Sequence, residues 1–126
     1  MKIVISNQSE LPIYAQIREQ IKEQILSGRL KEGETLPSIR VLARELGVSV
    51  ITTTRAYRDL EEEGYVTSMQ GKGSIVLFKD NSKVREQALR RIEDGLQIAV
   101  DAAKRMEISS EEVKDMLQIL WEEQGL

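Results

Sequence analysis

Basic side chains gather between residues 36 and 60, where four arginines stand against two acidic residues. The arginines are Arg40, Arg44, Arg55 and Arg58. A guanidinium group is a permanent cation with five N–H donors in a planar fork, which suits phosphate oxygens and the acceptor edge of guanine. A lysine, Lys72, stands between Gly71 and Gly73, and this triplet lacks the remaining residues of a nucleotide-binding glycine loop. The spacing indicates a locally basic surface on a protein whose formal net charge is −3.

The chain lacks the side chains that most catalytic and metal-binding chemistry requires. Its 126 residues include no histidine and no cysteine. This removes the commonest general base, cysteine nucleophiles, disulfides and thiolate metal sites. A carboxylate pair would be the remaining route to catalysis, but the acidic residues fall on solvated faces of predicted helices. We therefore expect no enzyme, with no catalytic residue, no metal site and no cofactor.

Apolar runs in the chain are too short for a membrane span or a secretion signal. The longest, residues 75–78, cannot cross a bilayer, and the first six residues fall short of a signal-peptide core. Hydrophobic residues make up 40% and charged residues 31%, as in ordinary globular proteins. We expect a cytoplasmic protein that contacts no membrane, with its excess of acid concentrated in residues 80–126.

The first strong hydrophobic pattern predicts a helix over residues 11–30. Isoleucines recur every four residues from Ile13 to Ile25, which places them along one helix face. Pro12 suits a position in the first turn, and Gly28 suits a C-terminal cap.

Two further helices follow, separated by a very short turn. Ser38 is placed to cap a helix that runs to Leu46, Gly47 ends that helix, and Ser49 is placed to cap the next one, residues 49–63. Two helices joined in this way are a helix-turn-helix motif. The second helix presents side chains mainly on its first turns, as a recognition helix does towards the major groove of DNA. The outward-facing residues are Ser49, Val50, Ile51, Thr54, Arg55 and Arg58.

Two β-like runs, residues 65–68 and 74–78, flank a glycine-rich tip and predict a hairpin with Lys72 at its turn. A two-stranded hairpin is marginal alone and must pack on the helices. A helix-turn-helix followed by such a hairpin is a winged helix.

The remaining residues predict two helices that need a partner surface. A Ser-x-x-Glu capping box within residues 109–112 starts the second helix near Ser110. So short a region rarely folds unaided, and a second copy of the chain is the simplest partner. The expected dimer interface is Leu89, Ile92, Leu96, Ala99, Ala103 and Met106 on the first helix, and Val113, Met116, Leu117, Leu120 and Trp121 on the second.

These elements together predict a mainly α protein with a small β component, of the α+β type. Residues 1–79 form a winged helix-turn-helix DNA-binding domain, and residues 80–126 form a two-helix dimerisation region.

The combination of motifs resembles one known family. Thr52 and residues 11–17, 25–28, 36–43, 46–49, 55–57, 60–65 and 71–73 are similar to the N-terminal domain of GntR-type transcriptional regulators. The short two-helix tail resembles the small YtrA-like branch, which lacks the large ligand-binding domain of other branches. The resemblance implies a dimeric bacterial DNA-binding regulator, by default a repressor, often encoded beside a transporter operon.

The resemblance also implies roles for single residues. Arg40 matches a family arginine that reaches DNA. Ser49, Thr52 and Arg55 match recognition-helix positions used for base or phosphate contacts, and residues 71–73 match the wing tip at the minor groove.

Val50 and Ile51 depart from the basic, proline or polar residues that are usual at their positions. Ile51 has no hydrogen bond to offer a base, although it can contact a thymine methyl group. The full set of expected DNA-binding residues is Ser38, Arg40, Ser49, Val50, Ile51, Thr52, Thr54, Arg55, Arg58, Gly71, Lys72 and Gly73.

The expected partners are double-stranded DNA and a second copy of the chain. The two-fold symmetry of a dimer predicts a palindromic operator, with half-sites spaced by roughly 10 bp or a multiple of it. The sequence identifies no small-molecule effector, and the tail is too small to enclose a pocket by itself. One alternative stays open: a winged helix used for protein contact without specific DNA binding, which the net acidity and the apolar pair Val50 and Ile51 favour.

Overall fold

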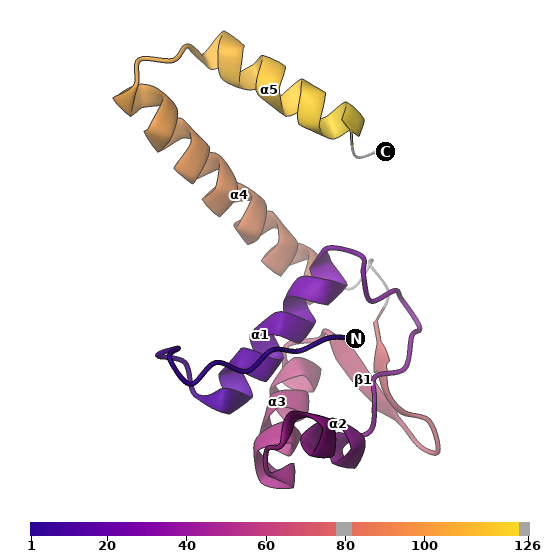
Figure 1. Cartoon of the computed structure of the whole chain (residues 1–126). Coiled ribbons are helices and arrows are strands. Elements are labelled where there is room, and N and C mark those ends of the chain that lie inside the picture. The colour runs from indigo at the N-terminus through magenta and orange to yellow at the C-terminus, as the bar shows by residue number, and fades with distance from the viewer. Residues whose placement is uncertain (78–81, 124–126) are drawn as a thin grey trace. The chain divides into compact units, whose positions relative to one another are not determined.

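Five helices and one two-stranded antiparallel sheet make up the described part of the chain, residues 1–77 and 82–123 of a computed structural model (Figure 1). This mainly helical architecture with a small β component confirms the predicted fold class. The chain divides into two compact units, Met1–Gln87 and Ala88–Leu126. The predicted domain boundary after residue 79 lies outside the described residues.

The first helix, α1 (Ile13–Leu26), is shorter than the predicted span of 11–30. Pro12 is its N-cap residue rather than part of its first turn, and Gly28 turns the chain away with a φ of 82°. The isoleucine stripe is also only partly buried, since Ile13 is 37% exposed. A four-residue spacing advances by about 40° per step on a helix with 3.6 residues per turn, so the stripe rotates out of the core.

The helix-turn-helix consists of α2 (Ile39–Leu46) and α3 (Val50–Glu62), as predicted. Ser38 Oγ accepts a hydrogen bond from the amide of Val41 at 3.2 Å, and Ser49 Oγ accepts one from the amide of Thr52 at 3.0 Å. Between the two caps, Gly47 adopts a left-handed conformation with a φ of 68°. This conformation, which glycine adopts without steric cost, ends α2 and lets α3 begin three residues later.

The wing is the hairpin of β1 (Val66–Met69) and β2 (Gly73–Val76), paired from Val66 opposite Val76 to Met69 opposite Gly73. The loop that precedes α2 adds backbone hydrogen bonds to the free side of β2. The amides of Gly33 and Leu36 donate to carbonyls of Val76 and Ser74, each at 2.8 Å. This support was not predicted, and of the expected second strand Phe78 lies outside the described residues.

The core of the first unit is formed by α1, α2, α3, the loop between α1 and α2, the wing strands and the start of α4 (Ser82–Arg105). Its buried side chains are Ile17, Ile21, Leu30, Leu36, Leu42, Ala56, Tyr57, Leu60, Tyr65, Val66, Val76 and Val84. The Tyr57 hydroxyl donates a 2.6 Å hydrogen bond to the carbonyl of Pro37, which ties α3 to the start of α2. Burial, reinforced by the charge of Glu45, raises the pKa of this hydroxyl well above its usual value.

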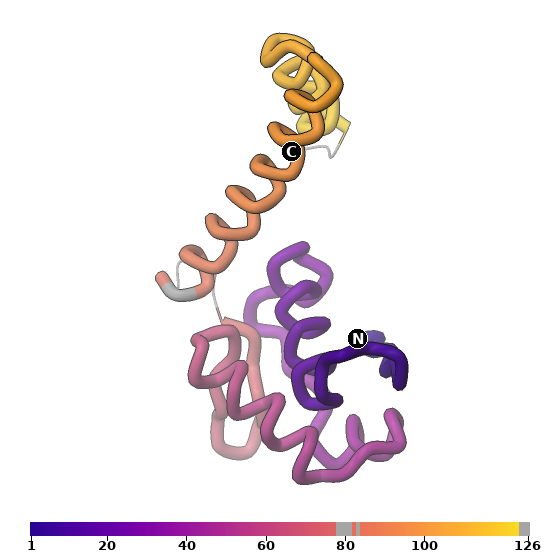
Figure 2. Tube along the Cα trace, turned by 90° about the vertical axis from the view of Figure 1, so that its left-hand side faces the viewer, coloured from indigo at the N-terminus to yellow at the C-terminus, as the bar shows by residue number. Residues whose placement is uncertain are grey.

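The N-terminal segment lies alongside α1 (Figures 1 and 2) and is held there by glutamines. The Gln16 carboxamide accepts from the amide of Ser6 at 2.8 Å and donates to its carbonyl at 3.0 Å. One turn later Gln20 makes the same pair of bonds with Val4, at 2.9 and 2.7 Å, and Gln24 donates to the carbonyl of Lys2.

In the second unit, α4 is joined to α5 (Ser110–Glu123) by a tight turn, and the two helices diverge from it (Figure 1). The amide of Ile108 donates to the carbonyl of Ala103 at 2.8 Å, while Glu107 takes a left-handed φ of 57°. Ser109 Oγ then caps α5 by accepting from the amide of Glu112 at 3.2 Å, as the capping box predicts.

Most apolar side chains of α4 and α5 lie in solvent. Among the described residues of the second unit, Ala103 is the only buried one, and Val113 is half-buried. The exposed large apolar residues are Leu89, Ile92, Leu96, Ile98, Val100, Met106, Met116, Leu117, Ile119, Leu120 and Trp121. None of the helices in the described residues is long and apolar enough to cross a membrane.

Candidate DNA-binding surface

The recognition helix α3 has a buried face and an exposed face. Thr53, Ala56, Tyr57 and Leu60 are buried, and they recur at spacings of three and four residues. The other face is formed by Val50, Ile51, Thr54, Arg55 and Arg58. Thr54 is half-buried and the other four residues are exposed, with Ile51 82% exposed.

Hydroxyl groups near the start of α3 are already ordered by local hydrogen bonds. Ser49 Oγ, besides capping the helix, donates to Thr52 Oγ1 at 2.8 Å. Thr54 Oγ1 donates to the carbonyl of Val50 at 2.7 Å. The Thr52 hydroxyl therefore keeps its proton for an external acceptor, whereas Thr54 presents lone pairs and a methyl group.

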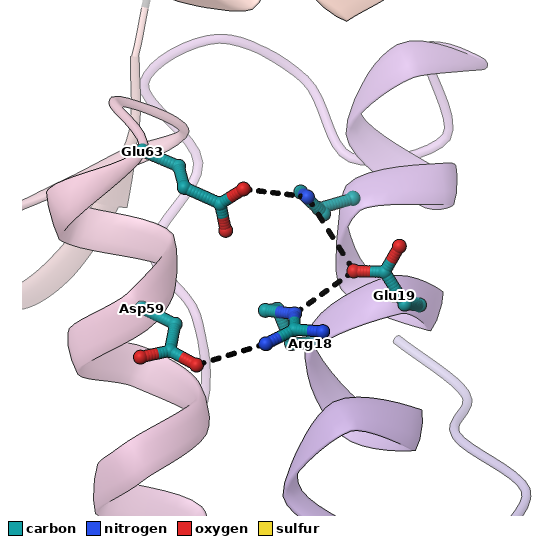
Figure 3. Close-up of polar contacts among 5 residues, drawn as sticks. Arg18, Glu19, Asp59 and Glu63 are labelled. Carbon is teal, nitrogen blue, oxygen red and sulfur yellow. Dashed lines mark hydrogen bonds and ion pairs between the residues drawn. The ribbon is translucent and has the colours of Figure 1, made fainter. Parts of the chain in front are cut away.

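Acidic side chains of α3 and of its C-cap residue Glu63 are engaged with other parts of the first unit. Asp59 Oδ2 lies 3.0 Å from Arg18 Nη1, and Glu63 Oε1 lies 2.8 Å from Lys22 Nζ, both on α1. Glu19 lies between these two cations, at 2.9 Å from Arg18 and 3.4 Å from Lys22 (Figure 3). The ion pairs fasten α3 to α1.

The pKa values within this network favour the charged forms. Burial alone would raise the pKa of Glu19, but the hydrogen bond from Arg18 and the charge of Lys22 lower it below its usual value. Burial opposes the charge of Arg18, yet its hydrogen bonds to Glu19 and Asp59 raise its pKa.

A third acidic residue of α3 fastens the wing. Glu61 Oε1 accepts a hydrogen bond from the amide of Ser68 on β1 at 3.1 Å, and Glu61 Oε2 accepts one from the Ser68 hydroxyl at 3.3 Å. Because a carboxylate on the recognition helix holds a wing strand, the two elements are oriented together.

The predicted cations, by contrast, are turned to solvent. Arg40 and Arg58 are exposed and form no ion pair with any residue that the structure describes, and the same holds for Arg44. Arg55 is exposed too, and its guanidinium lies over the ring of Tyr14, with its central carbon 3.7 Å from the ring centroid.

The wing tip is a tight turn closed by a 2.9 Å hydrogen bond from the amide of Lys72 to the carbonyl of Met69. Gly71 and Gly73 have φ values of 79° and 82°, which explains why glycines flank the lysine. All three tip residues are exposed. The wing tip, α2 and the first turns of α3 lie at the same end of the first unit (Figures 1 and 2).

Sequence patterns gave no role to Tyr14, Glu61 or Gln16. Each acts on a residue that is distant in the sequence or lies on another element, and local periodicity carries no signal for such pairs. Tyr14 lies inside the stretch that resembles the GntR family, but the resemblance implied no function for it.

A helix-turn-helix with exposed cations on its second helix and a basic wing tip defines a winged-helix DNA-binding domain. Residues 13–76 match the family model described as "Bacterial regulatory proteins, gntR family", and the chain belongs to this family of transcriptional regulators.

Similarity to individual members extends beyond this domain. The chain is 36% identical over 101 residues to the HTH-type transcriptional repressor YtrA of Bacillus subtilis (strain 168), covering 79% of this chain and 78% of YtrA. A YtrA structure from Sulfolobus acidocaldarius matches with a TM-score of 0.63 and 31% identity, over 98% of this chain and 100% of that one. The predicted resemblance to the YtrA-like branch is thereby confirmed.

A third relative has been solved on DNA. The DNA-binding domain of AraR in complex with operator ORX1 matches with a TM-score of 0.53 and 30% identity, covering 60% of this chain and 95% of that domain. The fold of the first unit is therefore one that a family member uses to bind an operator.

Proposed function

We propose that this protein is a homodimeric transcriptional repressor that binds a palindromic operator. The observation that carries the proposal is the separation of charge on α3. Asp59 and Glu61 of α3 and its C-cap residue Glu63 bind α1 and the wing, while Arg55 and Arg58 stay on the exposed face, where Glu62 at the end of the helix is the remaining exposed acid. A cationic stripe of this kind suits the phosphates and base edges of a major groove.

In this proposal Arg40, Arg58 and Lys72 supply phosphate contacts, which position the protein and carry no sequence information by themselves. Specificity comes from the first turns of α3, with Arg55 as a donor to guanine and Ile51 as an apolar contact for a thymine methyl group. The caps Ser38 and Ser49 add helix N-termini that favour nearby phosphates.

The dimer is proposed from the second unit. Residues 88–126 are near the size of about 40 residues below which a chain rarely folds unaided. The described residues of α4 and α5 leave almost all of their large apolar side chains in solvent, and Leu96 is 48% exposed. Exposed apolar side chains at this density mark an interaction surface. A second copy of the chain offers the same surface and closes the assembly by two-fold symmetry.

We propose repression, and a transporter operon as the target, by analogy with related proteins. YtrA of Bacillus subtilis is named a repressor, and we extend that sign to this chain. Control of a transporter operon follows from the resemblance to the YtrA-like branch.

Selection from a random double-stranded DNA library tests the proposal. The retained fragments should share an inverted repeat with half-sites about 10 bp apart, or a multiple of that distance. Arg55→Ala should weaken binding to this repeat by about 1–3 kcal/mol. Arg44→Ala is a matched control, because it removes an exposed arginine outside the predicted contact set and should cost less. A library with no enriched sequence would contradict the proposal and favour a protein-contact role for the winged helix.

A further inference from the structure

Tyr14, in the first turn of α1, lies against the recognition helix. The central carbon of the Arg55 guanidinium is 3.7 Å from the centroid of the Tyr14 ring, well inside the range of about 6 Å for cation–π contacts. At this distance the cation lies on the face of the ring rather than at its edge. The ring itself is half-buried and packs against the hydrophobic core, so its position is fixed by the fold.

The surroundings of Tyr14 add to this fixation. The guanidinium of Arg18, one turn further along α1, lies 5.8 Å from the same ring centroid. Arg18 is held in turn by Asp59 of α3 and by Glu19. The core and Arg18 therefore hold the ring through contacts that do not involve Arg55.

Stacking occupies the face of the Arg55 guanidinium and leaves its rim free. The five N–H donors of a guanidinium lie in its plane and point away from a ring stacked on its face. No residue that the structure describes accepts a hydrogen bond from Arg55. The side chain is thus held in one orientation while its donors remain open to an external acceptor.

We infer that Tyr14 is a positioning residue for DNA recognition, because its ring holds Arg55 in the orientation that presents its donors to a base edge. The inference rests on the proposed DNA contact of Arg55. An ordered arginine loses less conformational entropy when it binds than one that samples many rotamers. The ring should therefore increase affinity for the operator more than affinity for unrelated DNA.

A double-mutant cycle on the full-length protein tests the inference. Fluorescence anisotropy would measure binding of the wild type, Tyr14→Met, Arg55→Ala and the double variant to the selected repeat and to scrambled DNA. Methionine fills the space of the ring without an aromatic face. We expect Tyr14→Met to weaken binding to the repeat about 3- to 5-fold, the size of an exposed cation–π contact, with little change on scrambled DNA. In the Arg55→Ala background the same substitution should have no effect.

Tyr14→Phe separates the ring from its hydroxyl and should bind as the wild type does. If Tyr14→Phe is as weak as Tyr14→Met, the hydroxyl acts on its own and the inference is wrong. An equal loss from Tyr14→Met with and without Arg55 would also overturn it. If Arg55→Ala weakens binding but Tyr14→Met does not, only this inference fails. If Arg55→Ala changes nothing, the proposed DNA contact of Arg55 fails as well.

Nuclear magnetic resonance of the free protein provides a readout that does not depend on DNA. Ring-current shifts of the Arg55 side chain should be present in the wild type and retained in Tyr14→Phe. Their absence in the wild type would show that the stack does not form in solution and would overturn the inference.

Discussion

Glutamines of α1 supply the N-terminal segment with the hydrogen bonds that a strand usually receives from a neighbouring strand. Gln16 and Gln20 each pair with both backbone groups of one residue, Ser6 and Val4 respectively. Two residues of extended chain advance about 6.6 Å, and one helical turn of four residues advances about 6 Å, so the two repeats stay in register. Ile3 and Ile5, which alternate with the hydrogen-bonded residues Lys2, Val4 and Ser6, pack against the core.

Gln16→Ala should lower the free energy of unfolding by about 1–3 kcal/mol. Gln16 is buried, and it also donates to the carbonyl of Leu11, so the substitution removes three hydrogen bonds together with buried side-chain atoms. Gln20→Ala is the control, because Gln20 is more exposed and makes two bonds with Val4. Urea denaturation of both variants should rank Gln16→Ala as the more damaging, and the reverse order would contradict the anchoring role assigned to Gln16.

Because the pKa of Tyr57 is raised, we expect the free energy of unfolding to fall in alkali. Its pKa is raised in the folded protein, mainly by burial, so above pH 10 the unfolded chain loses this proton while the folded chain keeps it. The unfolding free energy should therefore fall as pH rises above about 10. Tyr57→Phe removes the bond to Pro37 and should cost about 0.5–1.5 kcal/mol at neutral pH, with the difference from the wild type shrinking in alkali. Denaturation curves at pH 8 and pH 11 would check this, and a constant difference would be inconsistent with a raised pKa.

Among elements, those whose signals are local could be predicted from the sequence. The caps Ser38 and Ser49 and the turn at Gly47 depend on residues within a few positions of each other, and the structure has them where they were expected. The support that the loop before α2 gives to β2 and the stack of Arg55 on Tyr14 could not be predicted, because both depend on which surfaces meet in the folded chain.

Backbone hydrogen bonds hold the wing on one side and Glu61 holds it on the other, so the strands that carry Lys72 at their tip are fixed to the rest of the first unit. Lys72→Ala should weaken binding to the operator and to scrambled DNA by similar factors and reduce the salt slope by about 1. Lys114→Ala in α5 removes an exposed lysine outside the winged-helix unit and serves as the control. Anisotropy titrations at several salt concentrations would measure both quantities. A loss confined to one base position would assign Lys72 to sequence reading instead.

At the scale of the whole molecule, the net charge does not indicate a DNA-binding surface. The formal net charge of −3 includes the acidic tail and the acids that α3 uses in its contacts with α1 and the wing. The exposed residues of the first unit include the cations Arg40, Arg55, Arg58 and Lys72, which in the proposed complex face DNA. The sequence-based expectation of a locally basic surface depended on position rather than on total charge, and the ion pairs of α3 supply its physical basis.

If the expected dimer interface of α4 and α5, here called the apolar seam, holds the dimer together, a charge placed in it should abolish dimerisation and operator binding together. Leu96→Glu or Leu117→Glu places a charge in the proposed interface and should give a monomer, with much weaker binding because only one half-site is held. Ile98→Glu is the matched control, since Ile98 is an exposed isoleucine of α4 outside the predicted seam, about half a turn from Leu96. Sedimentation should report a monomer for the first two variants and a dimer for the third. A Leu96→Glu protein that remains dimeric would remove this seam from the interface.

The most direct test of the central claim, sequence-specific DNA binding by a dimer, is fluorescence anisotropy on the selected inverted repeat and on its scrambled counterpart between 50 and 200 mM salt. We predict that one dimer binds each repeat, that the logarithm of the affinity falls linearly with the logarithm of the salt concentration, and that the repeat is preferred at every salt concentration. Weak and equal binding to both DNAs would contradict the account.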